Sequence, residues 1–287
     1  FVLLLSLMAF AAPVSADTLN WSAFSPVPSD TNQVLVEGVN VVDIGVSGDG
    51  DTIYAAGGAK ILYKSTNRGE TWSTIDTEDD CDADLVAVAP DNDDIVAYAG
   101  TDTDNLTVYV SINGGTTWDN LGKPKETGAD ADVSAINDLA ISPEKGGKYY
   151  IAVAGEEDDS LANVWYYDIY AASAYWHETN DKNGFNQTTA NVSGTATTAA
   201  AVAFSPNFAS DQVMLALILD TGDSEITLEV YSYNHSKWNV SAGFDGYGVE
   251  VTDAADITGI TSGSITLDPE YLFSDDSMRL SFIGLNV

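Results

Sequence analysis

The chain has 287 residues, 44 of them acidic and 10 basic, which gives a formal net charge of -34. A charge of this sign excludes a protein that holds nucleic acid through a basic surface. Hydrophobic residues make up 45% of the chain and include 6 Trp and 14 Tyr, so a core can be buried and the acidic residues form a solvated coat on a folded body.

Residues 1–16 are predicted to be a secretory signal. An apolar run from Phe1 to Phe10 is followed by Val14-Ser15-Ala16, a small-residue cleavage site. The run is too short to span a membrane. We therefore expect an exported protein that begins near Asp17, is secreted or held at the cell surface, and has no transmembrane segment once the signal is removed.

Residues 17–40 form an N-terminal segment with one predicted strand around Trp21, and residues 41–287 hold a series of similar units. Short β-rich runs are separated there by Asp, Gly, Asn and Pro clusters. First strands are predicted at 42–47, 85–90, 139–143, 202–206 and 265–269. Second strands are predicted at 52–56, 95–99, 149–154, 212–219 and 278–285. Third strands are predicted at 61–65, 107–111, 164–170 and 227–233.

Each of the first four units is predicted to open its fourth strand with a tryptophan. These residues are Trp72, Trp118, Trp176 and Trp238. Four strands per unit, repeating every 40 to 60 residues or so, are typical of propeller blades. A solenoid fits less well, because no helix separates the strands.

Two of these tryptophans end the same turn motif, Ser-x-Asn-x-Gly-x-Thr-Trp. Its defining residues are Ser65, Asn67, Gly69 and Trp72 in the first copy and Ser111, Asn113, Gly115 and Trp118 in the second. The Asn side chain can bond nearby backbone N–H groups, the Gly supplies a positive φ, and the Trp anchors the next strand in the core. The motif therefore predicts a tight turn between two strands.

This turn resembles the Asp-box, or bacterial neuraminidase repeat, of β-propellers, where it links the third and fourth strands of a blade. The resemblance implies an all-β fold, a β-propeller of four-stranded blades, with four blades readable and the start of a fifth. A strand such as that around Trp21 completes the last blade in many propellers. We expect residues that are not in this sequence to complete the ring.

The resemblance also raises the question of sialidase activity, which in that family needs three arginines to clamp a carboxylate. This chain has only Arg68 and Arg279, and Arg68 lies within the repeated turn. Sialidase activity is therefore disfavoured. A glycan hydrolase that uses paired carboxylates stays open as an alternative, because 44 acidic residues supply many pairs.

Three acidic loops place oxygen ligands at alternate positions, as calcium requires. The candidate ligands are Asp49, Asp51, Asp91, Asp93, Asp102 and Asp104. None of the loops has the full ligand set of a helix-loop-helix calcium site. We favour solvated turns between blade strands as the simpler interpretation, with calcium as the alternative cofactor.

Two further residue types carry predictions. A lone thiol, Cys81, excludes an internal disulfide framework and a Cys-rich zinc site, and its acidic surroundings predict a raised pKa and low reactivity.

Asn-x-Ser/Thr sequons predict glycosylation in solvent-facing loops, including a polar insertion at 183–198. They begin at Asn20, Asn105, Asn186, Asn191, Asn234 and Asn239.

The leading functional hypothesis is a non-catalytic exported protein that forms part of a surface layer, sheath or extracellular filament. Its partners would be further copies, other surface proteins or glycans. The alternative is an extracellular propeller that binds or cleaves glycans, with aromatic side chains at the ring mouth as sugar platforms. The first residues to consider for this role are Tyr166, Tyr167, Tyr170, Tyr175 and Trp176, although we expect most of them to serve in blade cores instead. A third hypothesis, a periplasmic assembly factor for a membrane complex, lacks a recognisable partner surface.

Overall fold

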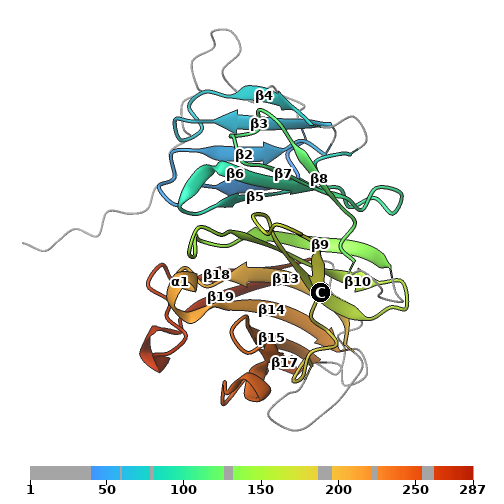
Figure 1. The fold of residues 1–287 in the computed structure, drawn as a ribbon, viewed down its shortest axis with the longest axis vertical. Coiled ribbons are helices and arrows are strands. Elements are labelled where there is room, and N and C mark those ends of the chain that lie inside the picture. Colours follow the sequence, from blue (N-terminus) through green and yellow to red (C-terminus); the bar gives the residue numbers. More distant parts are fainter. Residues whose placement is uncertain are drawn as a thin grey trace, which may run out of the picture. The chain divides into compact units, whose positions relative to one another are not determined.

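Figure 1 shows a computed structural model, which describes residues 40–58, 60–77, 81–125, 132–186, 196–220, 225–253 and 262–286. The chain divides into two units, residues 1–31 and 32–287, and all described residues lie in the second. The predicted signal at 1–16, the strand around Trp21 and the sequons at Asn20 and Asn191 lie outside the described residues.

The described chain folds into five consecutive antiparallel sheets, which we call blades 1 to 5. Blade 1 contains β1 (Asp43–Val46), β2 (Ile53–Ala56), β3 (Ile61–Ser65) and β4 (Ser73–Asp76). Blade 2 contains β5 (Leu85–Ala89), β6 (Asn92–Ala99), β7 (Val108–Ser111) and β8 (Asp119–Gly122). Blade 3 contains β9 (Val133–Ile141), β10 (Tyr150–Glu157), β11 (Ala162–Asp168) and β12 (Trp176–Glu178).

Blade 4 is larger and blade 5 is shorter. Blade 4 contains β13 (Ala196–Phe204), β14 (Val213–Asp220), β15 (Glu225–Ser232) and β16 (Lys237–Trp238), and β17 (Val249–Asp253) also pairs with β15. Blade 5 contains β18 (Ser262–Leu267) and β19 (Ser281–Asn286). The short helices are α1 (Phe208–Asp211), η1 (Asn239–Ala242) and η2 (Asp276–Met278).

The predicted strand order is confirmed in all four complete blades, where each strand pairs with the next along the chain. The first strands of the blades also pack in series: β1 on β5, β5 on β9, β9 on β13, and β13 on β18. Among the described strands this series does not close into a ring. Within the same residues, no helix has the length and apolar character needed to cross a membrane.

Four hydrophobic clusters form the core, and each is shared by two successive blades. Between blades 1 and 2, for example, Tyr54 and Leu62 pack with Val86 and Tyr98. We call the side of a blade that packs on the preceding blade its upstream face, and the other side its downstream face. Because an internal blade is buried on both faces, its strands are apolar at nearly every position, as in β14 (Val213–Asp220).

Candidate functional site

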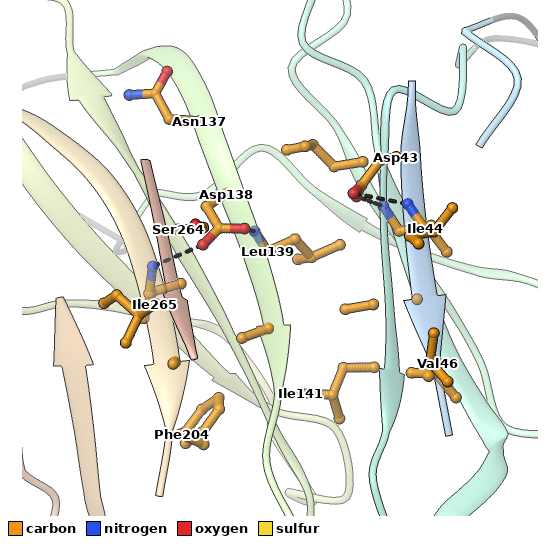
Figure 2. A pocket seen from close by; sticks show the side chains of 18 of the residues that line it. Asp43, Ile44, Val46, Asn137, Asp138, Leu139, Ile141, Phe204, Ser264 and Ile265 are labelled. Carbon is orange, nitrogen blue, oxygen red and sulfur yellow. Dashed lines mark hydrogen bonds between the residues drawn. The ribbon is translucent and has the colours of Figure 1, made fainter. Parts of the chain in front are cut away.

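The first strands of the five blades border a cavity of about 510 Å³ (Figure 2). Apolar side chains such as Ile44, Ile141 and Phe204 make up most of its lining. Asp43 and Asp138 also line it, and they supply its only charged side chains among the described residues. A pocket of this size with a few polar groups is the usual place to look for a ligand or a catalytic residue.

The carboxylate of Asp43 is bound by backbone N–H groups of two blades. Its Oδ1 accepts from the N–H of Ile44 in its own strand, and its Oδ2 accepts from the N–H of Val86 in β5, both at 2.8 Å. Burial raises the pKa of Asp43, and the two N–H donors oppose this rise because they favour the charged form.

Asp138 repeats the arrangement between blades 3 and 4 (Figure 2). Its Oδ1 accepts from the N–H of Leu139, and its Oδ2 accepts from the N–H of Val202 in β13, both at 2.8 Å. Burial raises the pKa of Asp138 to about 7, and the charge of Asp43 adds to the rise. The neighbouring Asn137 donates from its Nδ2 to the carbonyl oxygen of Ala199 at 2.9 Å, also in β13.

These contacts make Asp43 and Asp138 ties between neighbouring blades. A carboxylate that accepts two backbone N–H groups is strongly held, because charge-assisted hydrogen bonds are stronger than neutral ones. Leu85, Ala201 and Ser264 take the corresponding position in blades 2, 4 and 5. Sequence reasoning missed the two ties, although each Asp lies four residues before a serine, Ser47 or Ser142, that follows the first strand.

A fully buried acidic residue lies in blade 4, away from the cavity lining. The fully buried Glu229 accepts from the N–H of Asn186 at 3.0 Å, and burial raises its pKa to about 7. Asn186 in turn donates from its Nδ2 to Asp220 Oδ2 at 2.6 Å. The side chain of Asn239 joins this region, because its Oδ1 accepts from Val230 N–H at 3.0 Å.

The burial of two asparagines corrects part of the glycosylation prediction. The amide nitrogen of Asn239 donates to Gly184 O at 3.0 Å, and that of Asn186 donates to Asp220; both side chains are buried. In this fold neither residue lies in a solvent-facing loop, and a glycan on either nitrogen would break the hydrogen bond. Asn105 is partly buried and Asn234 is exposed, so these two stay candidates.

In the first acidic loop, the predicted calcium ligands contact the protein itself. Asp49 Oδ1 accepts from Ser47 Oγ at 2.6 Å and from Asp51 N–H at 3.0 Å. Asp51 forms an ion pair with Arg68, with 2.6 Å between Oδ1 and Nε. Within the described ranges, no group of three His, Cys, Asp or Glu residues is gathered as a metal would require.

The other acidic loops differ in their contacts. Asp93 Oδ2 accepts from Thr52 Oγ1 at 2.5 Å and so links blade 2 to blade 1. Asp91 Oδ2 accepts from Glu144 N–H at 2.8 Å. Asp102 and Asp104 are exposed. The assignment of calcium to these residues stays a prediction.

The two Ser-x-Asn-x-Gly turns have the same hydrogen bonds. The Oγ of Ser111 accepts from Gly115 N–H at 2.9 Å and donates to Asn113 Oδ1 at 2.9 Å. Ser65 makes the matching bonds to Gly69, at 2.8 Å, and to Asn67, at 2.9 Å. Gly69 and Gly115 have φ values of 81° and 87°, a conformation that favours glycine.

Trp72 and Trp118 follow these turns immediately before β4 and β8. The indole N–H of Trp72 donates to the carbonyl of Gly69 at 2.9 Å, and Trp118 packs edge-on against Tyr98 with 4.7 Å between ring centroids. The Ser, Asn and Gly residues of the motif therefore form the turn that the sequence predicted, and Trp118 packs against the core between blades 1 and 2, whereas the half-buried Trp72 contacts its own turn.

The aromatic run of the glycan hypothesis lies on the outer strands of blade 3. None of Tyr166, Tyr167, Tyr170, Tyr175 and Trp176 lines the cavity, and Tyr166, Tyr167 and Trp176 lie in or against the blade cores, as was expected for most of this run. Trp176 is buried and donates from its Nε1 to Leu121 O at 2.9 Å, which links blade 3 to blade 2. Tyr170 and Tyr175 are exposed.

Cys81 and the two arginines complete the set of predicted site residues. The thiol of Cys81 is fully buried, and burial raises its pKa to about 11, which confirms the predicted direction. Arg279 donates to the carbonyl of Phe273 at 2.6 Å and forms an ion pair with Asp276 at 2.8 Å. Neither Arg68 nor Arg279 is among the residues that line the cavity.

Comparisons with known proteins place the chain in a family. No curated protein matches it in sequence. Among solved structures it is similar to the hydrazine synthase of Kuenenia stuttgartiensis, with a TM-score of 0.47 and 14% identity, over 71% of this chain and 49% of that chain. It thus spans about half the length of the matched chain. Residues 14–217, more than half of the sequence, match the family described as the DUF6242 beta propeller domain. The chain therefore belongs to the DUF6242 beta propeller domain family.

Proposed function

We propose that this propeller chain is a non-catalytic, exported protein of the cell surface that forms part of a surface layer, sheath or extracellular filament. The observation that carries the proposal is the use of the cavity carboxylates. Asp43 and Asp138 each accept two backbone N–H groups from two blades, so the charged groups of the cavity serve to hold blades together.

Sequence features supply the extracellular part of the proposal. The apolar run at 1–10 and the cleavage site ending at Ala16 support export. The net charge of -34 supports a protein whose surface stays hydrated in a salty exterior. The matching hydrogen bonds of the Ser65 and Ser111 turns support assignment to the Asp-box type of propeller, which includes surface proteins.

Electron microscopy of the producing cells, with gold-labelled antibody against the chain, tests this function. We expect gold on an ordered surface lattice, a sheath or fibres, and no label in the cytoplasm. A matched sample from cells in which the gene is deleted controls for antibody specificity. Label confined to the cytoplasm, or to soluble protein in the medium with no assembly, would contradict the proposal.

Glycan binding is the second candidate, and the exposed rings of Tyr170 and Tyr175 favour it. Tyr175 packs on His177, with 4.0 Å between ring centroids, and His177 stacks on Tyr166. The exposed ring of Tyr175 is therefore held in place by packing. Such a platform suits the apolar face of a sugar. A glycan array tests this function. Glycan binding that is lost in Tyr175→Ala but retained in Val240→Ala would support it, and the absence of binding to any glycan on the array would contradict it.

A further inference from the structure

A short segment that follows blade 3 packs on the outer strand of blade 4. It consists of residues 179–186, directly after β12, and we call it the strap. Trp238 in β16 donates two bonds to it, from its backbone N–H to Asn183 O at 2.9 Å and from its Nε1 to Thr179 O at 2.9 Å. The ring of Phe185 packs edge-on against that of Trp238, with 5.4 Å between ring centroids. None of these groups titrates near neutral pH.

Asn186, the last residue of the strap, contacts two buried acids. Its backbone N–H donates to Glu229 Oε2 at 3.0 Å, and its Nδ2 donates to Asp220 Oδ2 at 2.6 Å. Glu229 is fully buried and Asp220 is 3% exposed. The strap is therefore also tied to blade 4 through two groups whose charge depends on pH.

Neutral groups surround the carboxyl group of Glu229. Its Oε1 accepts from Thr227 Oγ1 at 3.3 Å, and a Cβ added at Gly248 would lie 3.5 Å from the same oxygen. Among the described residues, no Lys, Arg or His forms a salt bridge with Glu229. The site thus offers hydrogen bonds to a carboxylate but no opposite charge.

The titratable groups around Glu229 come from blade 4, blade 3 and the strap. Those that share its upstream face of blade 4 by strand register are Asp220, Glu225, Tyr231 and Glu250. Those on the opposing face of blade 3 are Glu156, Tyr166 and His177. In the strap, Asp181 and Lys182 pair with each other, with 2.6 Å between Oδ1 and Nζ. The nearby charges of blade 4 are all negative, so an ionised Glu229 meets repulsion there.

Burial controls the acidity of Glu229. It raises the pKa of Glu229 above that of a solvated glutamate, the charge of Asp220 adds to the rise, and the N–H of Asn186 opposes it. Water that reaches the carboxyl group restores the ordinary pKa of about 4.3. Strands β14 and β15 pair along their whole length, so the strap is the part of the cover over Glu229 that can move most easily.

We propose that the strap is a pH-sensitive cover of blade 4, which stays closed while Glu229 is protonated and opens locally when Glu229 loses its proton to solvent. Opening exposes the rings of Phe185 and Trp238. The inference goes beyond the proposed surface function and does not depend on it. By linkage, the equilibrium constant for opening should rise up to about tenfold per pH unit between about pH 5 and pH 7 and level off above this range.

Hydrogen–deuterium exchange of the purified full chain, followed by mass spectrometry from about pH 5 to pH 8, tests the strap. Each exchange rate is compared with that of an unstructured peptide at the same pH, which gives a protection factor. The protection of the Trp238 amide, which is bonded to Asn183 O, should fall more than about tenfold between about pH 5 and pH 7. Amides of β14 such as Leu217 report global unfolding, so their protection should exceed that of Trp238 at every pH.

Three variants sharpen the test. Glu229→Gln keeps the shape of the side chain but does not titrate, so the protection of Trp238 should stay constant over this range. Asp220→Asn removes the neighbouring negative charge, so the fall should be smaller and level off at a lower pH. Asp245→Asn, at an exposed aspartate of the same blade, is the matched control and should behave as the wild type does. Circular dichroism establishes that each variant is folded, and Asp220→Asn carries the test if Glu229→Gln is not.

Two outcomes would overturn the inference. One is equal protection of Trp238 and Leu217 at every pH, because the strap would then open only when the whole chain unfolds. The other is a folded Glu229→Gln or Asp220→Asn variant whose Trp238 protection falls with pH as it does in the wild type. Neither outcome bears on surface assembly, which microscopy of the cells tests separately.

Discussion

The Oδ2 of Asp138 accepts the backbone N–H of Val202 at 2.8 Å, which joins the first strand of blade 3 to the first strand of blade 4. Asp43 makes the same bond to Val86 between blades 1 and 2. A β-propeller has few covalent constraints between blades, so such polar ties add direction to the otherwise non-directional apolar packing. The stability of the chain should therefore depend on them.

Replacement of Asp138 by alanine should lower the free energy of unfolding by about 2 to 3 kcal/mol, because the N–H groups of Leu139 and Val202 would lose their acceptor. Denaturant unfolding followed by tryptophan fluorescence measures the change. Asp245→Ala, at an exposed aspartate, is the control and should change the free energy by less than about 0.5 kcal/mol. Equal effects of the two substitutions would contradict the role of Asp138.

The buried acids predict a loss of stability as pH rises. Asp138 and Glu229 both have folded-state pKa values raised to about 7, whereas the unfolded values are about 3.9 and 4.3. The folded state therefore binds more protons than the unfolded state between these values, so the free energy of unfolding falls as pH rises from about 4 to about 8. The loss should be on the order of 4 kcal/mol for each of the two acids.

Glu229→Gln tests this linkage, because the amide keeps the shape of the side chain but does not titrate. The fall in unfolding free energy between about pH 5 and pH 8 should become shallower in this variant. Asp245→Asn, at an exposed position, should leave the slope unchanged. Unfolding midpoints measured at high salt remove the contribution of overall charge repulsion. A Glu229→Gln slope equal to that of the wild type would contradict the linkage.

Two glycines provide a matched test of the repeated turn. Gly115 and Gly50 both have positive φ, at 87° and 74°. A Cβ added at Gly115 would lie 2.8 Å from Ile75 Cδ1 of blade 1, whereas one at Gly50 would meet nothing within 4 Å. Gly50→Ala should therefore cost about 1 kcal/mol of backbone strain, and Gly115→Ala about 1 to 3 kcal/mol more. Thermal unfolding of both variants measures the difference. Equal losses of stability would show that a Cβ at Gly115 does not clash with Ile75 of blade 1.

Because the Cys81 thiol is buried, we expect it to react slowly with thiol reagents. Cys81 has a pKa raised to about 11 by burial, and its sulfur lies 3.3 Å from the carbonyl oxygen of Asp82. Because the thiolate is the reactive form, a disulfide reagent at neutral pH should label the native chain only as fast as it unfolds. Labelling in denaturant should be complete within minutes and serves as the control. Rapid labelling of the native chain would contradict this burial.

The arrangement of strands was readable from the sequence because both faces of each blade are buried. This makes strands such as β5 and β14 continuous apolar runs, and punctuation by Asp, Gly and Pro separates them. Trp118 marked a fourth strand for a physical reason, since its large ring packs against the core immediately before β8. β17 was not predicted, because its pairing with β15 depends on a chain reversal through η1.

The polar contacts of the cavity and of blade 4 were not readable, because burial of a polar side chain leaves little trace in one sequence. Asp138 looks like any other aspartate until Val202, 64 residues away, is placed beside it. Asn186 and Asn239 looked like surface sequons, but their amides satisfy buried groups. The aromatic run around Tyr166 left both a ring-mouth and a core position open, because its composition does not tell inner from outer strands.

The central claim, a structural propeller assembled at the cell surface, is tested most directly by cryo-electron tomography of the native surface with averaging of the repeating unit. The account predicts a lattice or fibre whose repeating density fits this chain. A cell surface on which the chain is present but forms no repeating assembly would contradict it.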